Sequence, residues 1–158
     1  MLFVRRIATL LACTAAVAVT STSHAELSAN LGLVSEYMRD GISETRGEYA
    51  AQLGTTYIHT SGLYGGLWAS ELKRNDDHTH SEWDLFGGFS HPISHNWGIA
   101  LGVTRNTFHG DWESNQQSYG EGFLRATYNQ SLVLGIRQTS NFMGSEFPRR
   151  VLEASYTL

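Results

Sequence analysis

Apolar and polar positions alternate along most of the chain, and the stretch from Ser61 to Ser70 shows this most plainly. After the turn signal Ser61-Gly62, the odd-numbered positions from Leu63 to Ala69 are apolar or small. The even-numbered positions from Tyr64 to Ser70 carry polar groups or small residues. Successive side chains of a strand point to opposite faces. The stretch therefore predicts a strand with one smooth apolar face and one polar face.

The same alternation recurs in further segments between Glu26 and Leu158, and none shows a competing period of 3.6 residues. Each segment is close to the roughly 9–11 residues that a tilted strand needs to cross a bilayer. The predicted strands cover residues 27–38, 48–58, 63–72, 81–90, 97–107, 118–128, 131–140 and 150–158.

The connections between these segments alternate in length. Long polar loops are expected at residues 39–47, 73–80, 108–117 and 141–149, and short turns near 59–62, 91–96 and 129–130. An even number of strands with this sorting of loops is typical of outer-membrane barrels. We expect an all-β fold, an eight-stranded antiparallel transmembrane β-barrel whose closure removes exposed edges. The alternative is a soluble barrel or sandwich with an aromatic core.

The N-terminal residues 1–25 have the pattern of a secretory signal peptide, which leaves residues 26–158 as the barrel. Arg5 and Arg6 precede an apolar run over residues 7–19, and Ser23-His24-Ala25 ends in a cleavage pattern. The run is shorter than the roughly 20 apolar residues of a membrane-spanning helix. Cys13 loosely fits a lipoprotein cleavage site, or is simply part of this run. The mature chain would then contain no cysteine and hence no disulfide or thiolate site.

The net charge of the predicted mature chain argues against one class of binding partner. Without Arg5 and Arg6, the 11 basic residues become 9, against 15 acidic ones, for a net charge of −6. Nucleic acid attracts clusters of Lys and Arg, so a nucleic-acid partner is not expected.

Aromatic residues gather at the two ends of the predicted apolar faces, where a membrane barrel carries its interfacial girdles. This placement predicts outer-membrane lipid as the partner of the outer surface. The girdle at the short-turn end would consist of Tyr57, Phe89, Trp97, Tyr128 and Tyr156, and the girdle at the long-loop end of Tyr37, Tyr49 and Trp83.

The opposite face collects charge, and buried charges require partners. This network would either fill the interior structurally or line a gated, selective path. A three-residue turn after Tyr128 would put Phe123 opposite Arg137 and Glu121 diagonal to it, with Arg125 reaching another carboxylate. The predicted interior charges are Glu36, Glu48, Glu82, Asp84, Glu121, Arg125, Arg137 and Glu153.

Two histidine-containing stretches are candidates for other chemistry. The run from Asp76 to His80 has imidazole and carboxylate groups that could bind a metal, but a solvated extracellular loop is the preferred interpretation. His91 and His95 flank Pro92 in a short turn, without the nucleophile and orienting acid that catalysis needs. We expect no metal, no cofactor and no enzymatic activity.

Three stretches resemble a known family. Residues 30–43, which contain Tyr-Met-Arg-Asp-Gly-Ile-Ser, residues 61–70 and residues 82–89 resemble the proteobacterial TorF-like porin family (Gcw_chp) of uncharacterised secreted β-proteins. The resemblance covers roughly residues 30–89 and implies an outer-membrane location, with no catalytic residues to transfer. Family members are typically longer than this chain.

Pattern and resemblance together predict a small outer-membrane barrel with periplasmic termini. The first hypothesis is a porin-like channel for small polar solutes. The alternative is a non-conducting structural or interaction barrel with a plugged, salt-bridged interior that presents its loops. Eight strands leave an interior just wide enough for side chains, which speaks against a wide pore. The sequence does not determine the oligomeric state.

Overall fold

The chain folds into one curved antiparallel sheet with a small separate hairpin. The computed structural model describes residues 25–74 and 78–157, so the predicted signal peptide lies outside the described residues up to His24. The strands of the large sheet are β1 (Glu26–Val34), β4 (Ala50–Ile58), β5 (Leu63–Glu71), β6 (Ser81–Pro92), β7 (Trp97–His109), β8 (Tyr119–Tyr128), β9 (Leu132–Thr139) and β10 (Arg149–Tyr156).

These eight strands pair in chain order, which confirms the predicted all-β fold and antiparallel arrangement. Each alternating segment of the sequence contributes one strand, since its apolar positions can share one face only when the strand is extended. The turn after β8 also has the predicted length. Tyr128 pairs with Leu132, and Phe123 consequently lies opposite Arg137.

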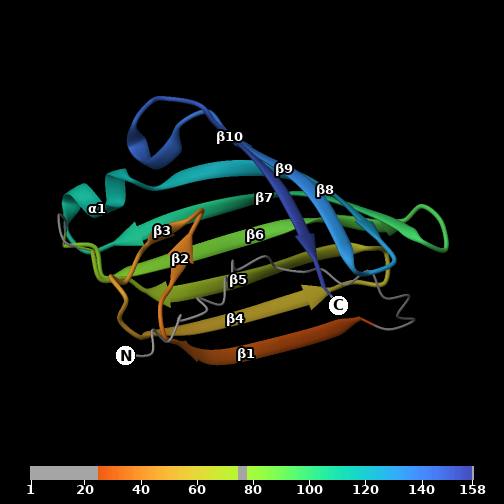
Figure 1. Cartoon of the computed structure of the whole chain (residues 1–158), viewed down its shortest axis with the longest axis horizontal. Coiled ribbons are helices and arrows are strands. Elements are labelled where there is room, and N and C mark those ends of the chain that lie inside the picture. Colours follow the sequence, from red (N-terminus) through yellow and green to blue (C-terminus); the bar gives the residue numbers. More distant parts are fainter. Residues whose placement is uncertain (1–24, 75–77, 158) are drawn as a thin grey trace, which may run out of the picture.

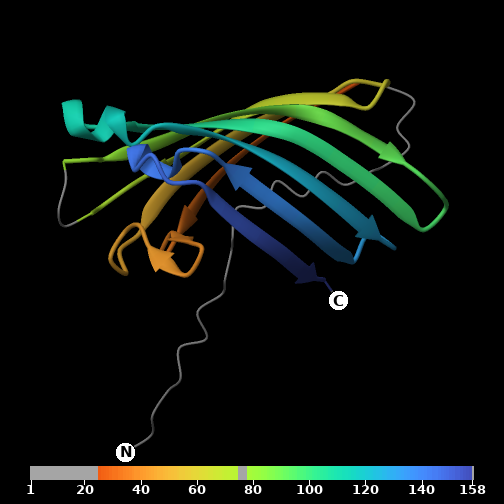
Figure 2. The same ribbon diagram turned by 90° about the horizontal axis from the view of Figure 1, so that it is seen from above.

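The predicted closure into an eight-stranded barrel is wrong for the described residues. β1 and β10 stand at the two ends of the strand order, and no pairing joins them. The sheet instead curls into an open trough, which Figure 1 shows from the side of β10 and Figure 2 from above. Alternation determines which face a side chain takes, but closure also depends on strand tilt and stagger. The sequence pattern does not encode these directly.

The predicted loop at residues 39–47 contains a hairpin instead. β2 (Met38–Arg39) pairs with β3 (Ile42–Ser43) around Asp40-Gly41, whose φ angles are 49° and 85°. Positive φ at both central residues is the geometry of a tight hairpin turn, for which Asp-Gly is a preferred pair. The hairpin lies on the concave side of the sheet (Figure 2), so this segment points inward.

The connections at residues 108–117 and 141–149 contain short helical turns. α1 (Trp112–Gln116) starts at Asp111, whose side chain accepts a hydrogen bond from the Ser114 amide, and η1 (Phe142–Gly144) precedes β10. No helix among the described residues is long and apolar enough to cross a membrane.

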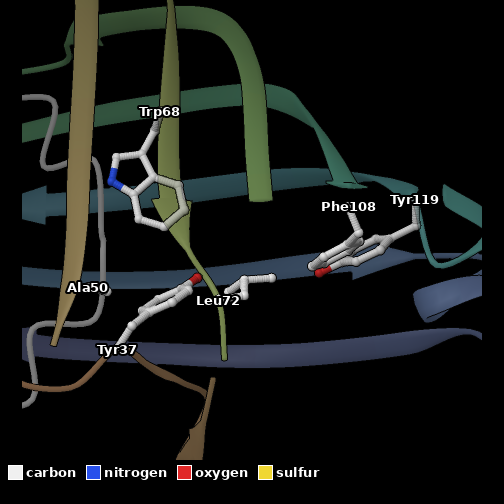
Figure 3. Close-up of a cluster of buried hydrophobic side chains, with 6 residues drawn as sticks. All are labelled: Tyr37, Ala50, Trp68, Leu72, Phe108 and Tyr119. Carbon is white, nitrogen blue, oxygen red and sulfur yellow. The ribbon is translucent and has the colours of Figure 1, made fainter. Parts of the chain in front are cut away.

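The buried apolar cluster lies where the hairpin segment meets the sheet (Figure 3). Tyr37 is 5% exposed and packs edge-on against Trp68, with ring centroids 5.3 Å apart. Phe108 and Tyr119 stack beside them at 6.3 Å. The cluster therefore anchors the chain that follows β1 to the middle strands of the sheet.

Glycines let aromatic rings lie flat on the concave face. Tyr64, Gly88, Gly102 and Phe123 form one row across β5 to β8. A Cβ atom on Gly88 would come within 2.7 Å of the Tyr64 hydroxyl, and one on Gly102 within 2.7 Å of the Phe123 ring. It would also approach a neighbouring backbone oxygen within 2.4 Å in each case. Glycine is thus required at both positions, and such glycines allow a sheet to curve.

Candidate functional site: the charged concave face

The concave face of the sheet encloses a cavity of about 910 Å³. Hydroxyl and amide groups of β1 and β4 line one side of it, and charged residues of β6, β8, β9 and β10 line the other. The hairpin segment contributes Arg39 and Asp40 to the same cavity. The site is therefore built from the polar face of the alternating strands together with a segment that folds back over it.

Arg39 joins the hairpin to the sheet through buried polar contacts. Its guanidinium forms an ion pair with the fully buried Glu82 carboxylate and lies 3.7 Å from Glu44. The Tyr37 hydroxyl donates a hydrogen bond of 3.1 Å to Glu82. The guanidinium also lies 5.0 Å from the centre of the Phe108 ring. A buried carboxylate needs such partners, because its desolvation is costly.

Asp40, at the tip of the hairpin, contacts the other end of the sheet. Its carboxylate accepts hydrogen bonds from Arg137 at 2.8 Å and from Arg149 at 2.6 Å. Burial alone would raise the pKa of Asp40, but the two guanidinium groups outweigh it and hold the pKa below its ordinary value of 3.8. The hairpin thus links the segment after β1 to β9 and β10.

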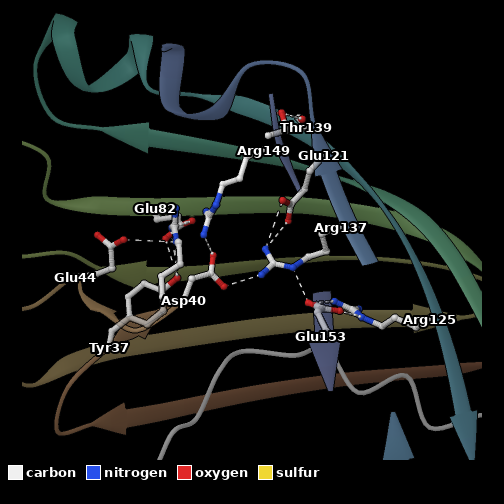
Figure 4. A network of polar contacts seen from close by, with 12 residues as sticks. Tyr37, Asp40, Glu44, Glu82, Glu121, Arg125, Arg137, Thr139, Arg149 and Glu153 are labelled. Carbon is white, nitrogen blue, oxygen red and sulfur yellow. Dashed lines mark hydrogen bonds and ion pairs between the residues drawn. The ribbon is translucent and has the colours of Figure 1, made fainter. Parts of the chain in front are cut away.

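Arg137 is the centre of the network on the C-terminal strands (Figure 4). It donates to Glu121 at 3.1 Å and to Glu153 at 2.6 Å, in addition to Asp40. Glu153 also accepts a hydrogen bond from Arg125 at 2.8 Å. Four charged residues of three neighbouring strands and one hairpin residue are therefore connected. Hydrogen-bonded networks of this kind lock side-chain positions.

The structure brings most of the predicted interior charges to the cavity and excludes one. Seven of them line it: Glu36, Glu82, Asp84, Glu121, Arg125, Arg137 and Glu153. Glu48 was expected on this face but is exposed and pairs with Lys73 at 3.2 Å. The reason is that β4 begins only at Ala50, so the alternation of β4 does not extend back to Glu48.

Sequence reasoning missed the inward residues of the long connections. The sequence pattern places Arg39, Asp40, Glu44 and Arg149 in loops, although all four belong to the ion-pair network. The pair Asp40-Gly41 between short apolar-containing stretches was the available signal for a hairpin. Nothing in the local sequence indicates that this hairpin folds inward.

The convex face is apolar and exposed. Leu31 is 84% exposed, Leu101 48% and Leu152 80%, and these residues lie on strands that span the whole sheet. Contiguous apolar surfaces of this extent are uncommon on soluble monomers and mark contacts with membranes or other proteins. The large exposed apolar side chains of the sheet strands are Leu27, Leu31, Leu33, Leu53, Tyr57, Leu63, Trp83, Leu85, Trp97, Leu101, Val103, Leu124, Leu134, Leu152 and Tyr156.

The predicted girdle residues are placed at the ends of this face with one exception. At the short-turn end, Trp97 and Tyr128 contact each other at 4.9 Å and Phe89 stacks on His91. Tyr57 and Tyr156 are exposed, as are Tyr49 and Trp83 at the other end. The exception is Tyr37, for which the predicted place in the girdle at the long-loop end is wrong. β1 ends at Val34, so the chain turns before Tyr37, whose ring enters the buried cluster.

The structure describes only part of the first histidine-containing stretch and all of the second. Asp76 and Asp77 of the candidate metal stretch lie outside the described residues. His91 lies near the end of β6 against Phe89, and His95 lies in the turn before β7, both on the surface.

Comparisons with known proteins add one match. A family model described as "Bacterial protein of unknown function (Gcw_chp)" matches residues 18–140. Searches of curated proteins and of solved structures give no match.

Proposed function

We propose that this chain, which belongs to the Gcw_chp family of bacterial proteins of unknown function, lies in the outer membrane and lines a narrow path for small polar solutes. The observation that carries the proposal is the contrast between the two faces of the sheet. The convex face exposes Leu31, Leu85, Leu101 and Leu152, whereas the concave face carries the charged network. An apolar outside and a polar lumen are the surfaces of a membrane-spanning β-sheet protein.

The chemistry of the concave face suits uncharged or zwitterionic solutes. Its arginines are engaged by carboxylates, as in the contacts of Arg137 with Glu121 and Glu153. Serine, asparagine, glutamine and threonine side chains line the opposite side of the cavity. Such groups can form hydrogen bonds with a passing solute at little cost in free energy, because water takes the place of the solute when it moves on.

A second candidate, a non-conducting structural or interaction protein, is favoured by the hairpin. Arg39 and Asp40 bind it to β6, β9 and β10 and so place backbone across the concave face. If the hairpin stays docked, the path is closed and the loops are the functional surface. The two candidates share the membrane location and differ in conduction.

Two measurements test the proposal in sequence. The refolded chain is mixed with phosphatidylcholine vesicles and floated on a density gradient, and we expect it to move with the vesicles. Floated protein is then recorded in a planar bilayer, where we expect small discrete conductance steps. Protein that remains at the bottom of the gradient contradicts the membrane location. Flotation without conductance supports the plugged structural protein instead.

A further inference from the structure

We propose that two copies of this chain close one ring of sixteen strands, in which β10 of each copy pairs with β1 of the other. This inference rests on the membrane location proposed above. It identifies a partner for the two free edges of the sheet and places the proposed path between the two copies.

The edges need a partner in a membrane. β1 and β10 each have only one neighbouring strand among the described residues, so each presents a row of unpaired backbone groups. The side chains beside these rows are apolar and exposed, including Leu31 and Leu33 on β1 and Leu152 on β10. Backbone N–H and C=O groups cannot remain unpaired in hydrocarbon, where no water replaces the missing bonds.

The two edges are complementary to each other. β1 runs toward the long-loop end and β10 runs away from it, so together they form an antiparallel pair. They are nine and eight residues long. When Leu31 and Ala154 both face outward, the apolar convex face continues across the junction, as the period of two requires.

The concave side favours a partner copy over closure of one chain on itself. An eight-stranded barrel holds only side chains or one small ligand. Here the same side holds the backbone of the hairpin at residues 38–43, tied to Arg137 and Arg149, as well as a cavity of about 910 Å³. Barrels of 16–18 strands enclose an aqueous channel, which has room for both.

The assembly also stops at two copies, because both edges of each sheet are then paired. Each junction joins β10 of one chain to β1 of the next, which is a head-to-tail contact. Such contacts form a ring when the rotation closes and a filament when it does not. The sheet is curved into a trough that is open on one side (Figure 2), so two copies with facing concave sides can meet at both pairs of edges and close the ring.

Cysteine cross-linking tests this arrangement, because Cys13 is the chain's single cysteine. In a Cys13→Ser background, one preparation carries Ala154→Cys on β10. The other carries Ala29→Cys, Leu31→Cys or Leu33→Cys on β1, so that three registers are sampled. The two preparations are refolded together into phosphatidylcholine vesicles, floated and oxidised. We expect a disulfide-linked dimer of twice the 17.5 kDa chain at one of the β1 positions. Leu85→Cys on the central strand β6 replaces the β1 variant as the control and should give no dimer.

Three outcomes would overturn the inference or its premise. A chain carrying both cysteines that forms only an internal disulfide would show closure within one chain. Floated protein that gives no dimer at any of the three positions would show that the edges do not meet between copies. Failure to float, scored before oxidation, would refute the membrane location and with it the inference that rests on it.

Discussion

At the scale of single residues, charge pairing controls the concave face. Arg137 contacts Asp40, Glu121 and Glu153, so one guanidinium neutralises carboxylates from a hairpin and two strands. Its side chain and that of Glu121 are 17% and 11% exposed. Removing one member of such a group leaves the others desolvated and unpaired.

We predict that Arg137→Ala lowers the free energy of unfolding by about 3–5 kcal/mol, the range for breaking a buried pair. Lys73→Ala is the control, since Lys73 and Glu48 form an exposed pair worth about 0–1 kcal/mol. Urea unfolding in detergent micelles measures both. In a double-mutant cycle of Glu121→Gln and Arg137→Met, equal and additive losses would contradict the coupling.

The pKa of Asp40 predicts a dependence on pH. The folded pKa lies below the ordinary 3.8, so its contribution to stability is complete above that value and is lost as the pH falls through the folded pKa. We expect Asp40→Asn to remove this part of the acid-induced loss of stability. Asp111, whose pKa is also lowered by hydrogen bonds from Ser114, contributes equally in both proteins. Unfolding followed by tryptophan fluorescence between pH 6 and about pH 2 is the measurement. Parallel curves would show that Asp40 is not paired.

At the scale of elements, the hairpin β2–β3 decides whether the concave side is open. Its turn depends on Gly41, whose φ of 85° is strained for any residue with a Cβ atom. The side chains of Arg39 and Asp40 also hold the hairpin, and its ladder has two residue pairs.

We predict that Gly41→Val costs about 1–2 kcal/mol, the cost of a left-handed conformation for a residue with a side chain, and thereby weakens the docking of the hairpin. Conductance should then rise. The fluorescence of Trp68 should also change, because the Tyr37 ring moves away from the Trp68 ring. Gly120→Val on β8 is the control, because Gly120 does not line the cavity and a Cβ atom there makes only an ordinary contact, 3.7 Å from the Thr104 carbonyl oxygen. If the fluorescence of the folded Gly41→Val protein changes while its conductance does not, the hairpin does not obstruct the path.

At the scale of the whole molecule, the sheet separates an apolar convex side from a polar concave side. Every strand of the large sheet contributes to both sides through its alternation, so the separation holds across the sheet. The membrane proposal depends on this property and on no single residue.

We predict that Leu101→Arg lowers the stability of the vesicle-bound protein by about 2–4 kcal/mol, the cost of a cation near the bilayer midplane. Ile93→Arg, in the short turn between β6 and β7, should cost about 0–1 kcal/mol because it lies near the interface. The yield of folded protein in flotation and its unfolding in urea measure the difference. Equal effects of the two substitutions would indicate that the convex face meets water.

The sequence by itself determined the strands, their order along the chain and the face of most side chains. Alternation is a local property with a period of two, so Leu101, Glu121 and Arg137 could be assigned to faces from their neighbours alone. The opposition of Phe123 and Arg137 followed from the length of one turn. The family resemblance rested on equally local motifs.

Only the tertiary structure decided how the ends of the sheet and the long connections are arranged. The open edges of β1 and β10 depend on the tilt and curl of eight strands together, which no single segment specifies. The inward hairpin depends on ion pairs that join Asp40 to residues about 100 positions later in the chain. Tyr37 and Glu48 were misplaced for a related reason, since strand ends are set by what the neighbouring chain covers and not by the alternation itself.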